Sequence, residues 1–402
     1  MFLNKYHHLK NKEINILIFL FLFSILIRIP AIVMFGDQSL ENEWKDIVNN
    51  LIAGKGFLYR GEPNLFMPPL YAYYLYFFSI FNFEDQNYVK LILSSQILLS
   101  SIVVVLFYKL NQEFFSKRTS LYSSILLTIF PLYIYSCTQI SSISLQVFLT
   151  TVFLFCFFQI LNRNNSLIIF VFSLVSGLLI LLRGEFLIIF IFSIIYFIIF
   201  FKINIKKILL ILLISFITIS PYMIRNIILF DSISITKSFG YNLWKGNNTH
   251  STVEGSVIHN ENLLSKIERI PKNNRHAINL DKVYLDEAIN NIKEEPKKYL
   301  FLSFKKFVSF MFININSSDP KYYNIFHYIP LLLVGLTSLA GIILSNKRSY
   351  KLNYLILIYF IIIIIFSFFF VLPRYKLAIL PLQIIFTNIL VEKIYRKFFA
   401  KQ

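Results

Sequence analysis

Long apolar runs alternate with short polar segments along most of this chain. A helix needs roughly 20 apolar residues to cross the hydrocarbon core of a bilayer, because backbone polar groups cannot stay unpaired there. Ten segments meet or approach that length, and we predict that each is a membrane-spanning helix. They cover residues 15–35, 90–108, 119–135, 141–161, 166–182, 186–201, 208–224, 325–344, 352–372 and 377–390. Arg28 interrupts the first run and no small-residue cleavage site follows it, so this run is predicted to be a retained anchor.

Two further apolar stretches, residues 65–83 and 299–315, are interpreted from the distribution of charge. The basic residues gather in five clusters, at 5–12, 117–118, 202–207, 347–351 and 393–401. With ten crossings all five clusters lie on one side, which the positive-inside rule makes cytoplasmic. An additional span at 65–83 would move the second cluster to the other side. Because the first stretch is rich in tyrosine and the second has Lys305 and Lys306 at its centre, both are predicted to be interfacial helices.

This topology leaves two long segments on the non-cytoplasmic side, residues 36–88 and 226–324. The second is polar, contains a predicted helix at 281–292 and has too few apolar residues for a large separate domain, so we expect a small periplasmic cap. The predicted fold is an all-α membrane protein of about ten transmembrane helices. Its predicted parts are an N-terminal transmembrane module at 1–225 that includes the first outer loop at 36–88, the cap at 226–324, and C-terminal transmembrane helices at 325–402.

The composition supports a membrane protein. Of 402 residues, 56% are hydrophobic and 15% are charged, whereas roughly 25% are charged in soluble domains. The net charge of +18 would point to nucleic acid in a soluble protein, but here it is interpreted against the membrane, and no nucleic-acid partner is expected. Cys137 and Cys156 lie in apolar stretches and provide neither a disulfide framework nor a metal-ligand spacing.

Charged side chains concentrate at the predicted outer ends of the spans, where burial makes them costly and therefore informative. The cations and the amide are Arg28, Arg183, Arg225, Asn226, Arg374 and Lys376, and the acids of the first outer loop are Asp37, Glu41, Glu43 and Asp46. Cations at one depth suit an anionic group, and carboxylates suit a proton. For each arginine the alternative of reaching ordinary lipid phosphates stays open. Glu185, two residues after Arg183, is interpreted as a local charge pair.

Signatures of several other chemistries are missing from the sequence. The six histidines show no metal-ligand spacing, so a zinc enzyme has little support. No glycine-rich phosphate loop and no serine nucleophile motif occurs, which argues against nucleotide-dependent chemistry. No cofactor is therefore predicted, and a divalent cation held by oxygen ligands of the outer acids is the one that is left open.

Four groups of motifs follow one another in the order found in a known family. They are Glu43-Trp44, Leu51, Gly54-Lys55-Gly56-Phe57 and Met67-Pro68-Pro69-Leu70-Tyr71; Leu182-Arg183 after Gly177; Pro221-Tyr222-Met223-Ile224-Arg225-Asn226 with Gly240-Tyr241-Asn242-Leu243-Trp244-Lys245-Gly246-Asn247-Asn248 and Gly255; and Arg374 before Pro381. From about residue 28 to 385 the chain thus resembles the polytopic GT-C glycosyltransferases of the protein-mannosyltransferase and aminoarabinose-transferase kind.

The resemblance implies a GT-C-type helix bundle with interfacial helices in its first outer loop, which agrees with the topology derived from charge. It also implies transfer of a sugar from a polyprenyl-phosphate donor to a lipid, glycan or protein acceptor on the outer face. The catalytic candidates are Glu43 as general base, with Glu41 and Asp37 as alternatives. The candidates for binding substrate, including the charge of the leaving lipid phosphate, are Arg28, Arg183, Arg225, Asn226, Arg374, Lys376 and Tyr71. One catalytic carboxylate with in-line attack would invert the anomeric centre.

The sequence departs from the family at two places. Leu40 stands where many relatives have an aspartate, and Ser141-Ser142-Ile143-Ser144 stands where many have an acid at the start of the fourth span. These departures leave the identity of the base open and weaken a metal-assisted or two-acid mechanism. The predicted location is a bacterial inner membrane that is crossed many times, with both termini cytoplasmic and the active site periplasmic or extracellular.

Two other functions remain alternatives. A transporter or flippase for a glycolipid or polyprenyl phosphate would also use outward-facing arginines, but the two halves share no visible repeat of the kind common in transporters. A non-catalytic membrane subunit that only binds a glycolipid would keep the arginines and tolerate loss of Glu43.

Overall fold

The computed structural model describes residues 2–41, 43–81, 85–162, 165–317, 322–345 and 349–398. The elements are α1 (Phe2–Phe35), α2 (Glu43–Ile52), β1 (Leu58–Tyr59), β2 (Glu62–Pro63), α3 (Pro69–Ser79), α4 (Asp85–Asn111), α5 (Lys117–Ile129), α6 (Pro131–Ser136), α7 (Ile143–Asn162), α8 (Ser166–Leu182), α9 (Phe186–Ile199), α10 (Ile205–Phe230), α11 (Phe239–Gly246), α12 (Glu261–Glu268), α13 (His276–Glu294), α14 (Pro296–Met311), α15 (Ile325–Leu344), α16 (Tyr350–Phe368), the 3₁₀ helix η1 (Pro373–Ala378) and α17 (Leu380–Phe398). Of the basic clusters predicted from sequence, residues 347–348 and 399–401 and the side chains of 5–10 lie outside the described residues.

The fold is an all-α, multi-pass membrane bundle, as the hydrophobic pattern predicts. Within the described residues, six helices are long and apolar enough to cross a membrane, namely α1, α4, α7, α10, α15 and α16. The shorter helices α8 and α9 are also apolar. The two remaining predicted spans, at 119–135 and 377–390, coincide with α5–α6 and α17. The bundle faces lipid with many exposed isoleucine, leucine and phenylalanine side chains, as expected where the solvent is hydrocarbon.

The predicted span at 119–135 is divided into two helices, which corrects the expectation of one continuous helix. The backbone of Phe130 is extended (φ −66°, ψ 117°), and Pro131 occupies the first turn of α6. Proline lacks a backbone N–H and disfavours a helical conformation in the residue before it. Helix α5 therefore ends at Ile129, where the backbone N–H of Phe130 donates to the carbonyl of Leu127 at 3.4 Å.

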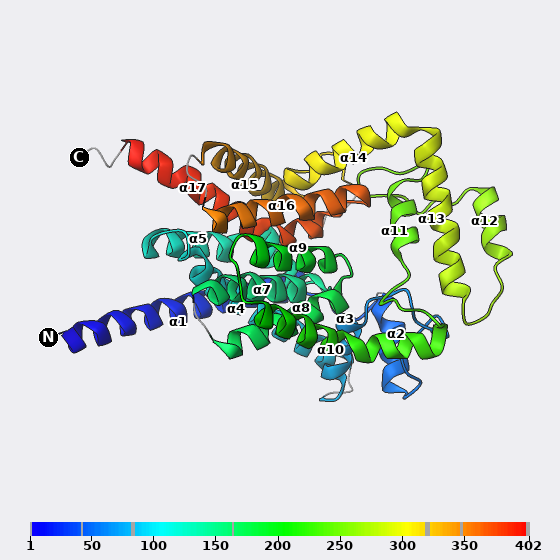
Figure 1. The fold of residues 1–402 in the computed structure, drawn as a ribbon, viewed down its shortest axis with the longest axis horizontal. Coiled ribbons are helices and arrows are strands. Elements are labelled where there is room, and N and C mark those ends of the chain that lie inside the picture. Colours follow the sequence, from blue (N-terminus) through cyan, green and yellow to red (C-terminus); the bar gives the residue numbers. More distant parts are fainter. Residues whose placement is uncertain are drawn as a thin grey trace.

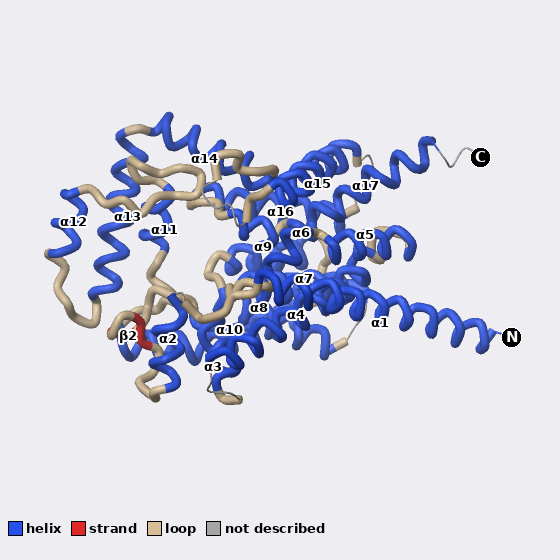
Figure 2. Tube along the Cα trace, turned by 180° about the vertical axis from the view of Figure 1, so that it is seen from behind, coloured by secondary structure: helices blue, strands red, loops and turns tan. Residues whose placement is uncertain are grey.

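The two ends of the bundle differ in content (Figure 1). Both chain termini lie at one end, hereafter the terminal end, whereas α2, α11, α12 and α13 lie at the opposite end, the loop end. The view from behind shows the same separation (Figure 2). The two stretches predicted to be interfacial contain α3 and α14, and α3 starts only at Pro69 because Pro68-Pro69 suits a first helical turn. Their position in a membrane surface stays a prediction.

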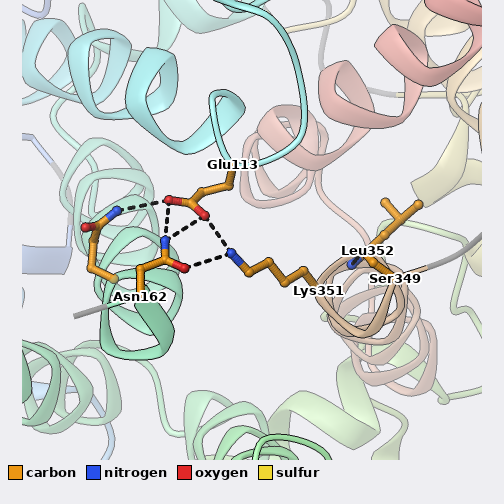
Figure 3. A network of polar contacts seen from close by, with 6 residues as sticks. Glu113, Asn162, Ser349, Lys351 and Leu352 are labelled. Atoms are coloured by element: carbon orange, nitrogen blue, oxygen red, sulfur yellow. Dashed lines mark hydrogen bonds and ion pairs between the residues drawn. The ribbon is translucent and has the colours of Figure 1, made fainter. Parts of the chain in front are cut away.

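Carboxylates tie the helices together at the terminal end (Figure 3). Glu113, after α4, accepts hydrogen bonds from the side-chain amide of Asn162 at 2.8 Å and pairs with Lys351 Nζ at 2.7 Å, so it joins α7 and α16. Glu13 of α1 pairs with Lys117 of α5 at 2.9 Å. Half-buried charges of this kind are stable only when they are paired. These contacts hold the ends of the spans in register.

The helices α11, α12 and α13 form a small unit at the loop end, hereafter the cap helices. They pack around a separate core of Trp244, Leu263, Tyr284 and Ala288. The helix predicted at 281–292 lies within the longer α13. The loop end therefore carries a compact helical layer that positions the residues between α10 and α14.

Candidate functional site

Two arginines from distant parts of the sequence meet at one aromatic ring at the loop end. The guanidinium carbon of Arg183, which follows α8, lies 4.8 Å from the ring centroid of Tyr375, and that of Arg374 lies 5.9 Å from the same centroid. Arg374 and Tyr375 belong to η1. Arg183 also pairs with Glu185 at 3.3 Å, which confirms the predicted local charge pair. The structure thus brings together two of the predicted cations.

A third cation, Lys245 of α11, lies beside them. Its Nζ is 4.4 Å from the ring centroid of Phe370, and the rings of Phe370 and Tyr375 are 6.1 Å apart. Burial lowers the pKa of Lys245, the neighbouring Arg374 lowers it further, and Glu43 acts in the opposite direction. Arg183, Lys245 and Arg374, hereafter the cation cluster, therefore surround two adjacent rings. Lys245 lies in the motif at residues 240–248, but nothing in the sequence distinguishes it as a site residue.

Glu43 is the first residue of α2, and its side chain is exposed. A carboxylate in the first turn of a helix is stabilised by the helix dipole. Because Glu43 acts on the pKa of Lys245, it lies within electrostatic reach of the cation cluster. Glu41 is also exposed, but it pairs with Lys45 at 3.1 Å. Of these two neighbouring acids, Glu43 is the one whose charge acts on Lys245 of the cluster.

Asp37 has a different set of neighbours. Its Oδ2 accepts a hydrogen bond from the backbone N–H of Ile140 at 2.6 Å, and its own N–H donates to the carbonyl of Thr138 at 3.0 Å. Asp37 thereby fastens the end of α1 to the loop after α6. Its charge also contributes to the raised pKa of Tyr71, although burial is the larger cause. The two candidate bases Asp37 and Glu43 therefore act on different groups.

Tyr71 is fully buried in α3. Its ring packs edge-on against Trp44, with centroids 5.1 Å apart, and the tryptophan directly follows Glu43. The hydroxyl of Tyr71 has no hydrogen-bond partner among the residues that the structure describes. Tyr71 thus packs against the start of α2, and its hydroxyl is free to donate a hydrogen bond.

Arg225 and Asn226, at the loop end of α10, hold neighbouring loops. Arg225 Nη1 donates to the carbonyl of Asn64 at 2.9 Å and to Asn226 Oδ1 at 2.7 Å, and Nη2 donates to the carbonyl of Phe57 at 3.2 Å. Asn226 Nδ2 donates to the carbonyl of Ser234 at 2.7 Å. Both side chains use their polar atoms on the protein itself, so the structure gives them a positioning role for the first loop.

Arg28 and Lys376 are buried inside the bundle, away from the surface on which the sequence placed them. Arg28 Nη1 donates to Ser24 Oγ at 2.7 Å, and its guanidinium carbon lies 4.9 Å from the ring centroid of Tyr133. Lys376 Nζ donates to the carbonyls of Phe310 and Phe312 at the end of α14. Helix ends inside a bundle leave carbonyl groups that need donors. Lys376 thus binds interior carbonyl groups, whereas Arg28 Nε and Nη2 are buried without a hydrogen-bond partner among the described residues.

An apolar groove of about 610 Å³ runs between α14 and α16. Leu300 and Phe304 line it on one side, Ile364 and Phe368 on the other, and Lys297 lies at its edge. Leu300, Phe304 and Phe368 are exposed, so the groove is open at the surface of the bundle. Since Phe368 is two residues from the ring that Lys245 covers, the groove lies next to the cation cluster.

The described residues contain no group of three His, Cys, Asp or Glu side chains that could hold a metal ion. The acids of the first loop are instead separated, with Asp37 bound to the loop after α6 and Glu41 bound to Lys45.

Part of the chain matches a known protein family. Residues 66–224 match the family model of dolichyl-phosphate-mannose-protein mannosyltransferases. The matched part contains Tyr71 and Arg183, whereas Glu43 and Arg374 lie outside it. Among curated proteins the comparison finds no match.

Solved structures of membrane glycosyltransferases resemble the fold. The oligosaccharyltransferase of Archaeoglobus fulgidus, tethered with an acceptor peptide, has a TM-score of 0.56 and 13% identity over 98% of this chain and 50% of its own. The oligosaccharyltransferase AglB from the same organism, in complex with an inhibitory peptide and a dolichol-phosphate, gives 0.55 and 14% over 98% and 51%. ArnT from Cupriavidus metallidurans bound to undecaprenyl phosphate gives 0.45 and 9% over 94% and 77%.

The chain spans about half the length of the archaeal structures that it matches. The fold resembles that of these archaeal membrane oligosaccharyltransferases. The resemblance to GT-C glycosyltransferases that the outer-loop motifs indicate is thus confirmed for the fold and, over residues 66–224, by the family model.

Proposed function

We propose that this chain is an inverting glycosyltransferase that moves a sugar from a polyprenyl-phosphate donor to a lipid, glycan or protein acceptor. We further propose that it works on the outer face of a bacterial inner membrane, with the loop end outside. The observation that carries the proposal is the convergence of Arg183 and Arg374 on Tyr375, at the end of the bundle where α2 presents Glu43. The GT-C fold supports it.

The chemistry follows from where charge develops. The acceptor hydroxyl oxygen forms a bond to the anomeric carbon while the bond from that carbon to the phosphate oxygen breaks. The acceptor proton passes to the Glu43 carboxylate, and the leaving group is the polyprenyl phosphate. Arg183 and Arg374 stabilise the growing negative charge on that phosphate by charge-assisted hydrogen bonds. Attack opposite to the leaving group inverts the anomeric centre.

The apolar groove between α14 and α16 suits part of the prenyl chain of the donor. Its walls are aromatic and aliphatic, and it lies beside the cation cluster. A lipid that enters from the membrane would thus bring its phosphate to the cations while its chain stays in an apolar environment.

The experiment that tests the function compares membranes from a deletion strain with membranes that carry wild-type protein or the Glu43→Gln variant. Lipid-linked glycans are profiled by mass spectrometry, and sugar transfer from polyprenyl-phosphate sugars is measured directly. We expect a glycan that lacks one sugar in the deletion strain and in the Glu43→Gln strain, and normal transfer in the Glu41→Gln control. Transport of the lipid in liposomes without sugar transfer would instead establish the transporter alternative.

A further inference from the structure

Helix α11 is only eight residues long, and side chains of two neighbouring helices hold both of its ends. At its start, Asp281 Oδ1 accepts a hydrogen bond from the backbone N–H of Tyr241 at 3.1 Å. At its end, Lys306 Nζ donates to the carbonyl of Gly246 at 2.7 Å. Both side chains thus bond backbone groups that the ends of a helix leave unpaired. The surrounding helices α13 and α14 thus hold a helix that is too short to be stable alone.

Close packing of α11 against neighbouring backbone also restricts its movement perpendicular to the helix axis. A Cβ atom on Gly240 would lie 2.0 Å from the carbonyl oxygen of Asp281, and one on Gly246 would lie 1.9 Å from that of Phe369. The Asn247 side chain adds a hydrogen bond to the carbonyl of Phe368 at 2.8 Å. Because these contacts are with backbone atoms, they leave little freedom for the helix to shift against α13 and the end of α16.

This arrangement positions one side chain, Lys245, in the last turn of α11. Its Nζ lies over Phe370, half-buried, and makes no hydrogen bond or ion pair with any residue that the structure describes. Arg374 is close enough to act on it as a like charge. Two cations brought together in a partly buried place repel each other, and a bound anion would offset that cost. An exposed lysine without a function would instead extend into solvent.

We propose that Lys245 is a further substrate-binding residue, which with Arg374 binds the phosphate of the polyprenyl-phosphate donor. The inference rests on the proposed function and deepens it by naming a residue that holds the donor headgroup. A lysine ammonium binds phosphate as a point charge with three donors, so it tolerates the change in phosphate geometry as the sugar leaves. Lys306 then acts as a positioning residue, because it holds the end of α11 from which Lys245 projects.

The first test does not need sugar transfer. The full-length protein in detergent is treated with an amine-acetylating reagent, and the acetylation rate of each lysine is read by peptide mass spectrometry. A polyprenyl phosphate is expected to slow acetylation of Lys245 at least five-fold, and the matching neutral polyprenol is expected to have no effect. Exposed Lys282 of α13 serves as the control in the same samples. Equal acetylation of Lys245 with and without the phosphate would overturn the proposal.

The second test uses variants and separates this inference from the proposed function. Lys245→Met is expected to raise the KM for the donor at least ten-fold with a smaller change in kcat, and Lys245→Arg is expected to restore much of the affinity. Lys282→Met is the matched control. A protein that transfers no sugar but still shows phosphate protection of Lys245 would refute the proposed function alone. Normal donor KM in Lys245→Met would refute the role of Lys245 alone.

The positioning role of Lys306 is tested with the same acetylation readout. Lys306→Met is expected to weaken the protection of Lys245 by the polyprenyl phosphate at least three-fold while the protein stays folded, as judged by its thermal unfolding. Lys305→Met, which changes the exposed neighbour, is expected to leave the protection unchanged. Full protection in folded Lys306→Met would show that Lys306 does not position Lys245.

Discussion

Lys306 of α14 is fully buried, and its Nζ donates to the last carbonyl of α11, that of Gly246, at 2.7 Å. Burial lowers the pKa of Lys306 to about 7, from an ordinary value of 10.5. The contact between α14 and the cap helices therefore rests on an amine that changes its charge near neutral pH.

A dependence of stability on pH follows from this pKa. Between pH 7 and pH 10.5 the unfolded chain keeps a proton on Lys306 that the folded chain has lost, so stability rises with pH in this window. Below pH 7 both states bind the proton, and the gain is absent. One proton corresponds to a slope of about 1.4 kcal/mol per pH unit. Thermal unfolding in detergent from pH 7 to pH 10 should show a slope that is smaller in Lys306→Met than in wild-type protein and in Lys305→Met by about this amount. Equal slopes in all three would contradict it.

The two candidate bases respond differently to removal of their charge. Asp37→Asn keeps an oxygen that can accept from the Ile140 N–H, so we expect a folded protein with nearly normal transfer. Glu43→Gln removes the proposed base and should lower kcat/KM by about 10²–10⁴-fold, the range typical of general-base catalysis. Initial rates of sugar transfer, measured in membranes with matched levels of each variant, show which carboxylate the reaction needs. A loss in Asp37→Asn with normal rates in Glu43→Gln would transfer the role to Asp37.

Helix α11 should not tolerate a side chain at its last residue. Gly246→Ala places a Cβ 1.9 Å from a backbone oxygen, so the helix must shift, and we expect a loss of roughly 1–3 kcal/mol, as for other overpacked sites. Gly184→Ala is the matched control, because nothing lies within 4 Å of the added Cβ and its φ is not positive. Melting temperatures in detergent compare the two. Similar values for both variants would mean that α11 is less tightly packed than described.

The orientation of the bundle is tested with single cysteines. Ser39→Cys lies at the loop end and Arg118→Cys at the start of α5 at the terminal end, and both positions are exposed. If the loop end faces outward, a membrane-impermeant maleimide added to intact cells will label Ser39→Cys and will label Arg118→Cys only after lysis. Wild-type protein is the control, since Cys137 and Cys156 are buried. Labelling with the reverse pattern would place the proposed active site on the cytoplasmic side.

The sequence by itself determined the membrane architecture and much of the candidate site. Apolar runs of sufficient length must be helices in hydrocarbon, because no other regular structure of a single segment satisfies its own backbone. The convergence of Arg183 with Arg374 and the charge pair of Arg183 with Glu185 followed from their positions at span ends. The pattern did not predict the break before Pro131, because the apolar run continues through it.

Only the tertiary structure decided which cations face inward and which reach the cation cluster. The direction of a side chain at a helix end depends on how the helix is rotated against its neighbours, and that rotation is set by packing between segments far apart in the sequence. Arg28 and Lys376 are buried, with hydrogen bonds to an interior hydroxyl and an interior carbonyl, and their part in binding substrate stays a prediction. Lys245 became part of the site for the same reason, because α13, α14 and α16 together hold the short helix that carries it.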